Sequence, residues 1–224
     1  PARPLAVLLR DAAMLDAFGR PDAAGRTLLS DPAARVVPVA VREDAPLSAG
    51  LAPGLDRLGV MLAYTPLHAL LLARVGAPLV MSSGNASGCP QVTDDAVALR
   101  DLAGIADGWL MHDRPIARRL DDSVMAVVDG QPRVLRRGRG LAPEPLTLPP
   151  GFAMAPPVPA MGADLKAAFC LTRNGQAPLL HHMGNLDEAG VAEALPAGLG
   201  QYSAPCAPAP PTHSSPRRPC LFNH

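Results

Sequence analysis

Residues 79–90 have the sequence LVMSSGNASGCP, in which a short apolar run stops and small polar residues follow. Apolar runs bounded in this way are typical of a buried strand that ends in a tight loop. Because alternate side chains of an extended backbone share one side, Ser83, Asn85 and Ser87 are expected to point together. The two glycines of the loop allow a ligand to approach the backbone closely. Such a loop suits a phosphate or a carboxylate, although its composition fits an ordinary Ser/Gly turn equally well.

The chain around this loop alternates between strand and helix patterns. Thr65 followed by Pro66 is a strong helix-start signal, because Thr caps a helix and Pro suits its first position. Pro38 lies in a strand pattern and predicts an edge strand or a bulge. The alternation predicts an α/β domain with a partly parallel sheet. Strands are expected at 5–9, 35–41, 58–63, 79–81 and 109–111, and helices at 12–18, 66–75 and about 93–102.

Two Xaa-Gly pairs then mark hairpins. Asp129-Gly130 separates β-rich runs at 123–128 and 133–136, and Asn174-Gly175 separates runs at 168–173 and 177–182. Such pairs favour the left-handed turns that join antiparallel strands. The proline-rich segment between the hairpins indicates a linker. The C-terminal tail shows neither the helical nor the strand spacing of apolar residues. The predicted organisation is a first domain at 1–149, a linker at 150–160, the start of a second domain at 161–194, and a disordered or aberrant tail at 195–224.

Composition excludes several classes of protein. The 224 residues are 48% hydrophobic, enough to bury a core, and a formal net charge of zero gives no bulk attraction to nucleic acid or membrane. The four cysteines form no C-x-x-C pair, which argues against a zinc ribbon and gives no disulfide framework. The sequence contains neither the ~18 apolar residues of a membrane span nor a signal peptide. We therefore expect a cytoplasmic protein, and the first residue, Pro1, suggests a fragment of a longer chain.

Arginine is concentrated around the first predicted hairpin. Guanidinium groups bind phosphate or carboxylate in a bidentate manner, and two or three of them could converge on one face of a hairpin. A solvated surface, partly neutralised by neighbouring aspartates, explains the pattern as well. His68 is expected to cap or pack rather than to catalyse, and no P-loop, G-x-G-x-x-G or G-x-S-x-G motif occurs. The arginines concerned are Arg114, Arg118, Arg119, Arg133, Arg136, Arg137 and Arg139.

A series of long segments carries a more specific pattern. Residues 58–68 have the sequence LGVMLAYTPLH and residues 78–88 the sequence PLVMSSGNASG. They are followed by AGIAD at 103–107, HDRPI at 112–116, RRLDDSV at 118–124, LRRGRG at 135–140 and GADLK at 162–166. In this order the segments resemble the HypF family of hydrogenase-maturation carbamoyltransferases, and the resemblance runs from about residue 1 to residue 194.

The resemblance implies a fold and an activity. Residues 1–149 would be most of a YrdC-like domain, a twisted mixed sheet with flanking helices and a concave basic face, followed by a truncated hairpin that begins an ASKHA-type carbamoyltransferase domain. The first domain would make carbamoyl-adenylate from carbamoyl phosphate and ATP, with Mg²⁺, and the second would pass the carbamoyl group to the C-terminal cysteine of HypE. The catalytic group is unknown. The expected nucleotide- and carbamoyl-binding residues are Arg3, Thr65, Ser83, Asn85, Ser87, Arg119, Ser123 and Arg136.

Departures from the family pattern leave alternatives open. Arg3 stands where the family usually has Lys, and the family's zinc-finger and acylphosphatase-like modules are absent, so no zinc is expected. The second domain stops before its metal-binding histidine motif, so we do not expect the chain to complete the reaction alone. A threonylcarbamoyl-adenylate synthase of tRNA modification is the second hypothesis, although it would lack the segment at 162–171. A non-catalytic fragment that binds nucleotide or double-stranded RNA is the third.

Overall fold

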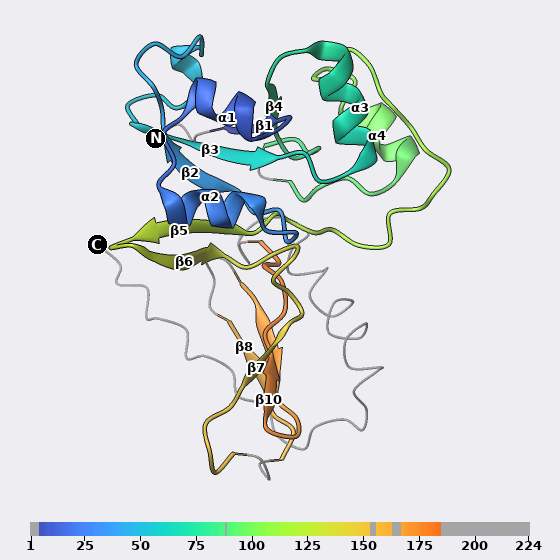
Figure 1. Ribbon diagram of the computed structural model, residues 1–224. Coiled ribbons are helices and arrows are strands. Elements are labelled where there is room, and N and C mark those ends of the chain that lie inside the picture. The colour runs from blue at the N-terminus through green and yellow to red at the C-terminus, as the bar shows by residue number, and fades with distance from the viewer. Residues whose placement is uncertain (1–4, 88, 153–155, 163–166, 185–224) are drawn as a thin grey trace, which may run out of the picture. The chain divides into compact units, whose positions relative to one another are not determined.

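The chain divides into two compact units. The computed structural model describes residues 5–87, 89–152, 156–162 and 167–184 (Figure 1). The first unit comprises residues 1–83 and 122–140, and the second comprises residues 84–121 and 141–224. The predicted Arg3 and the predicted tail at 195–224 lie outside the described residues. The predicted domain boundary near residue 150 stays a prediction.

The first unit is built on a mixed four-stranded sheet. Its strands are β1 (Ala6–Leu9), β2 (Val37–Ala40), β3 (Arg57–Leu62) and β4 (Leu79–Met81), in the order β2-β3-β1-β4. β1 and β3 are parallel, whereas β2 and β4 pair antiparallel with their neighbours. The sheet confirms the predicted α/β class. Pro38 lies on the edge strand β2, as its missing N–H requires.

The helices of this unit begin at side-chain caps. In α1 (Ala12–Phe18) the Asp11 carboxylate accepts the N–H of Met14, and in α3 (Pro66–Val75) the Thr65 hydroxyl accepts the N–H of His68. These two helices confirm the predictions, because cap, Pro66 and the closing glycine all act as expected. A further helix, α2 (Ala23–Ser30), was not predicted, and Asp22 caps it in the same manner.

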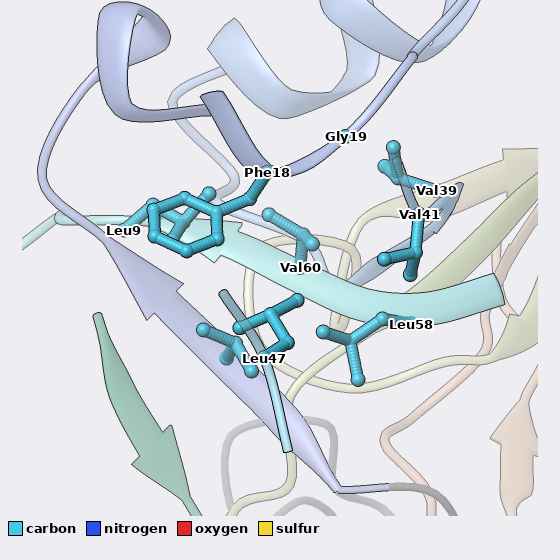
Figure 2. Close-up of a pocket in the computed structure, with 9 residues that line it drawn as sticks. Leu9, Phe18, Gly19, Val39, Val41, Leu47, Leu58 and Val60 are labelled. Atoms are coloured by element: carbon cyan, nitrogen blue, oxygen red, sulfur yellow. The ribbon is translucent and has the colours of Figure 1, made fainter. Parts of the chain in front are cut away.

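The core occupies both faces of the sheet. Leu8 and Met61 project to one face, where they pack with Val36 and with Leu72 of α3. Val60 projects to the other face, where side chains of β1, β2 and β3 and Phe18 of α1 line a small apolar pocket (Figure 2). Full burial of a side chain of this size contributes about 1.5–3 kcal/mol, so the alternation along β1 and β3 stabilises both layers.

The first predicted hairpin belongs to this unit. β5 (Val124–Val128) pairs with β6 (Gln131–Arg136), and both turn residues, Asp129 and Gly130, have positive φ values of 51° and 71°. The turn therefore has the left-handed backbone that the Asp-Gly pair predicted. Val36 connects the hairpin to the sheet region, because its N–H donates to the Ser123 carbonyl and its carbonyl accepts from Met125.

The second unit contains one helix and short paired strands among its described residues. α4 (Asp95–Asp101) begins two residues later than predicted, because Asp94 is its cap. β8 (Pro159–Met161) pairs with β9 (Phe169–Leu171), and β7 (Pro145–Thr147) pairs with β10 (Gln176–Pro178). Arg173 and Gln176 exchange two backbone hydrogen bonds of 2.9 Å across Asn174-Gly175, which confirms the second hairpin turn.

One strand prediction is wrong. Residues 109–111 form no strand, and Trp109, Leu110 and Met111 expose 38%, 70% and 41% of their surface. An apolar triplet does not specify a strand unless a partner backbone satisfies its hydrogen bonds, and no described strand pairs with this one. Among the described residues, no helix combines the length and apolar character that crossing a membrane demands.

Candidate functional site

Ser123, a predicted phosphate-binding residue, is completely buried at the start of the β5–β6 hairpin. Its hydroxyl donates to the carbonyl of Arg139 at 2.9 Å and accepts the N–H of Gly138 at 2.9 Å. A hydroxyl has one proton to donate, so both of these bonds serve the backbone that follows β6. In this structure the Ser123 side chain therefore closes the base of the hairpin.

Asp122 organises Arg136, the last residue of β6, and Arg139, which follows this strand. Its backbone carbonyl accepts from Arg136 Nε at 2.9 Å, and its carboxylate accepts from Arg139 Nε at 3.0 Å and from an Arg139 terminal nitrogen at 2.9 Å. Arg139 also donates to the carbonyls of Ala33 and Ala34, at 3.3 Å and 2.7 Å. Arg139 thus holds the loop after α2 against the hairpin, whereas the bond from Nε to the Asp122 carbonyl orients Arg136.

The aromatic group at the start of α3 lies against the same arginine. The Arg139 guanidinium carbon is 3.7 Å from the centre of the Tyr64 ring, a cation–π contact. Tyr64 in turn meets His68 edge to face, with ring centres 4.5 Å apart. Burial lowers the pKa of His68, whose Nδ1 is buried without a hydrogen-bond partner, and burial raises the pKa of Tyr64. These shifts keep both side chains uncharged at neutral pH.

The Ser/Gly/Asn loop is closed by its own asparagine. Asn85 Nδ2 donates to the carbonyls of Ala86 and Cys89, both at 2.9 Å, and its Oδ1 is buried without a partner. The N–H of Val92 donates to the Gly84 carbonyl at 2.9 Å and closes the neck of the loop. Ser87 is exposed. The loop therefore keeps its shape through the Asn85 amide while its serine faces solvent.

Arg119 is attached to the segment that leaves this loop. Its Nε donates to the Gln91 carbonyl at 2.6 Å, and the Gln91 amide donates to the Asp121 carboxylate at 2.7 Å. Arg119 is otherwise exposed, so an anion can approach its guanidinium from solvent. The sequence pattern predicts no role for Gln91, and it predicts only that aspartates such as Asp121 and Asp122 partly neutralise the arginine-rich surface.

The predicted site residues fall into two groups. Thr65, Ser83, Ser123 and Arg136 belong to the first unit, and Asn85, Ser87 and Arg119 belong to the second. Within the first unit, Ser123 and Arg136 both bond backbone near Asp122, while Thr65 caps α3 and Ser83 is exposed after β4. No group of three or more His, Cys, Asp or Glu that could hold a metal ion occurs in the described part of the chain.

The fold places the chain in a known class of α/β proteins. Residues 1–138 match the Sua5/YciO/YrdC family model, which carries the description telomere recombination. The chain belongs to this family. Residues 153–211 match a second model, the HypF Kae1-like domain.

Individual relatives give a narrower similarity. The chain is 50% identical to carbamoyltransferase HypF of Rhodobacter capsulatus over 91% of its length, and 46% identical to carbamoyltransferase HypF of Rhizobium leguminosarum bv. viciae over 84%. It spans 27% and 25% of these two proteins, about a quarter of each. The crystal structure of full-length HypF in a phosphate- and nucleotide-bound form matches 95% of the chain, with 33% identity and a TM-score of 0.89, and the chain covers 33% of it. The mixed α/β fold is thus the fold of the corresponding HypF region.

Proposed function

We propose that this chain is the nucleotide-handling part of a HypF-type carbamoyltransferase and forms carbamoyl-adenylate from carbamoyl phosphate and ATP. The observation that carries the proposal is the match over 95% of the chain to a HypF structure that holds phosphate and nucleotide. The 50% identity to a curated HypF over almost the whole chain supports the same assignment.

The residue types suit the proposed chemistry. Carbamoyl phosphate and water give carbamate and inorganic phosphate, and a carbamate oxygen then bonds to the α-phosphorus of ATP while pyrophosphate leaves. Both reactants are anions, so guanidinium and N–H donors must neutralise them before they can meet. Arg119 in the second unit is oriented for this task, because the Gln91 carbonyl fixes its Nε atom.

The same proposal implies a metal ion, Mg²⁺, and a protein that accepts the carbamoyl group, HypE. Mg²⁺ binds proteins through one or two carboxylates and completes its shell with water and substrate phosphates, so it would enter with ATP rather than occupy a protein cage. A complete HypF-type protein would then pass the carbamoyl group to the C-terminal cysteine of HypE.

The two alternative hypotheses have less support. A threonylcarbamoyl-adenylate synthase of tRNA modification would lack the segment at 162–171, whereas residues 153–211 match the HypF Kae1-like domain. A nucleotide-binding fragment without turnover differs from our proposal only in its activity. The experiment below therefore measures binding and turnover separately.

The test is calorimetric titration of the whole chain with ATP and with carbamoyl phosphate, combined with measurement of pyrophosphate release. We expect binding by the unmodified chain and its loss in the double variant Ser83→Ala/Asn85→Ala. Ser30→Ala is the matched control, because Ser30 is an exposed serine at the end of α2. Equal binding by all three proteins, or none by any of them, would contradict the proposal, and binding without pyrophosphate release would favour the non-catalytic fragment.

A further inference from the structure

Four side chains connect the Ser/Gly/Asn loop to the second hairpin within the second unit. Arg119 Nε donates to the Gln91 carbonyl at 2.6 Å, and Gln91 Nε2 donates to Asp121 Oδ1 at 2.7 Å. The other oxygen of that carboxylate, Oδ2, lies 3.5 Å from His182 Nε2. Residues 91 and 182 are thus joined through one aspartate, although the sequence separates them widely.

The backbone determines which nitrogen of His182 carries the proton. The N–H of Gly184 donates to His182 Nδ1 at 3.3 Å, so Nδ1 is an acceptor and carries no proton in the neutral ring. The proton of the neutral ring is then on Nε2, the nitrogen that faces Asp121. Neutral His182 can therefore donate to Asp121.

The contact between His182 and Asp121 connects two segments of the second unit. His182 precedes Gly184, whose carbonyl accepts the N–H of Ala167 at 2.9 Å, and the N–H of Met183 donates to the Ala167 carbonyl at 2.7 Å. These bonds fix His182 to the strand region beside β9, inside the segment that matches the HypF Kae1-like domain. Gln91 lies on the other side of Asp121. It immediately precedes Val92, whose N–H closes the neck of the loop.

We propose that Asp121 and His182 are positioning residues, which hold Gln91 and Arg119 in the geometry that binds an anion and so couple the loop to the second hairpin. The identity of the anion, a phosphate or carbamoyl phosphate, rests on the proposed function, whereas the coupling does not. His182 donates to Asp121, Asp121 orients the Gln91 amide, and the Gln91 carbonyl orients the Arg119 guanidinium. Burial lowers the pKa of the neighbouring His181, and Arg118, Asp121 and His182 act on that pKa as well, so His181 and Arg118 belong to the same charged surroundings.

Coupling of this kind is reciprocal. If the His182 contact improves anion binding at Arg119, then anion binding must stabilise the His182 contact by the same factor. A HypF-type enzyme would gain from such a link, because the segment that accepts the intermediate would be ordered when the site that makes it is filled. The link is therefore testable from either end.

Two substitutions of His182 separate the two nitrogens. In His182→Gln the amide nitrogen lies near the former Nε2 and can still donate to Asp121. In His182→Asn the amide can accept from Gly184 but does not reach Asp121. We expect His182→Asn and Asp121→Ala to weaken binding of carbamoyl phosphate and of inorganic phosphate about tenfold, and His182→Gln to change it less than about threefold.

A second readout needs no ligand. Amide hydrogen exchange at Val92 reports the neck of the loop, and we expect it to accelerate in His182→Asn and Asp121→Ala but not in His182→Gln. Slow exchange at Leu180, whose N–H donates to the Phe169 carbonyl across the hairpin, shows in each variant that the hairpin remains folded. Equal behaviour of the Gln and Asn variants in both measurements would overturn the coupling. Accelerated exchange in a chain that binds neither anion would support the coupling and contradict the proposed function instead.

Discussion

Arg139 and Arg119 belong to one arginine-rich stretch, but they lie in different surroundings. Arg139, in the first unit, has a side chain that is 24% exposed and donates to Asp122, Ala33 and Ala34. Arg119, in the second unit, is an exposed residue whose Nε donates to the Gln91 carbonyl. The first guanidinium holds three segments of the fold together, whereas the second remains accessible to a ligand. Residue type alone therefore does not identify an anion-binding arginine; its hydrogen-bond partners do.

Two of the three serines predicted to bind ligand differ in the same way. Ser123 is fully buried and bonds two backbone groups, whereas Ser87 is exposed in the loop of the second unit. Buried polar groups in low-dielectric surroundings need their partners, and exposed ones can exchange a partner for water. The contrast predicts that substitution of a buried, hydrogen-bonded side chain lowers stability, whereas substitution of an exposed side chain lowers ligand binding.

The largest expected effect is that of Arg139→Ala. The substitution leaves the carboxylate of Asp122 and two carbonyls without their donor, and hydrogen bonds to charged groups are worth about 1.5–3 kcal/mol each before relaxation. We expect the free energy of unfolding in urea to fall by about 3 kcal/mol. Arg119→Ala, the matched control, should change it by less than about 0.5 kcal/mol.

In a binding experiment we expect the opposite order for these two variants, with the larger effect from Arg119→Ala. Arg119→Ala should weaken binding of carbamoyl phosphate more than it lowers the free energy of unfolding, because the Arg119 guanidinium is accessible. Similar losses of stability from the two substitutions would show that Arg119 is also a structural residue, and the contrast between the two arginines would be wrong.

The second prediction concerns Ser123→Ala. Removal of the hydroxyl leaves the buried N–H of Gly138 without an acceptor, and an unsatisfied buried group costs about 1–3 kcal/mol. We expect the free energy of unfolding to fall by about 2 kcal/mol, measured by urea unfolding followed by circular dichroism. Ser87→Ala should leave it almost unchanged. Full stability of Ser123→Ala would show that water or a ligand group replaces the hydroxyl.

Local signals in the sequence predicted much of this fold. The cap Thr65 and the turns at Asp129-Gly130 and Asn174-Gly175 lie where expected, because each depends on a few adjacent residues. The family pattern likewise selected Ser123 and Arg136 for the site. It could not show whether their polar atoms bond backbone or face solvent, since that depends on residues brought together by folding.

The failures have the same physical origin. The apolar run at Trp109 has the composition of a strand, but strand formation requires a partner backbone that sequence pattern does not reveal. Gln91, Asp121 and His182 carry no local signal at all, since their relation exists only through contacts between distant segments. The contact of Arg139 with Ala33 and Ala34 is likewise invisible in the sequence.

The third prediction compares the two hairpin turns. Gly130 and Gly175 have φ values of 71° and 72°, a conformation that costs a residue with a Cβ about 1–2 kcal/mol. Gly130→Ala and Gly175→Ala should each lower stability by about 1 kcal/mol in thermal unfolding. Asp129→Asn is the control, because Asn tolerates positive φ well and should be almost neutral. A neutral Gly175→Ala would show that the second turn can adopt another backbone.

The smallest expected effect is a pH dependence shared by the two units. Burial lowers the pKa of His68 in the first unit and of His181 in the second below the ordinary value of 6.5. Between the lowered pKa and 6.5 the unfolded chain binds more protons than the folded chain, so stability falls as the pH falls through that window and levels off below it.

His181→Gln should flatten this pH dependence of stability more than His68→Gln, because His181 is only 6% exposed. Urea unfolding at several pH values between 5 and 7.5 measures the slope, and His112→Gln, at an exposed position, is the control. A steeper slope in either variant would mean that the histidine is protonated in the folded chain, contrary to the burial of its ring.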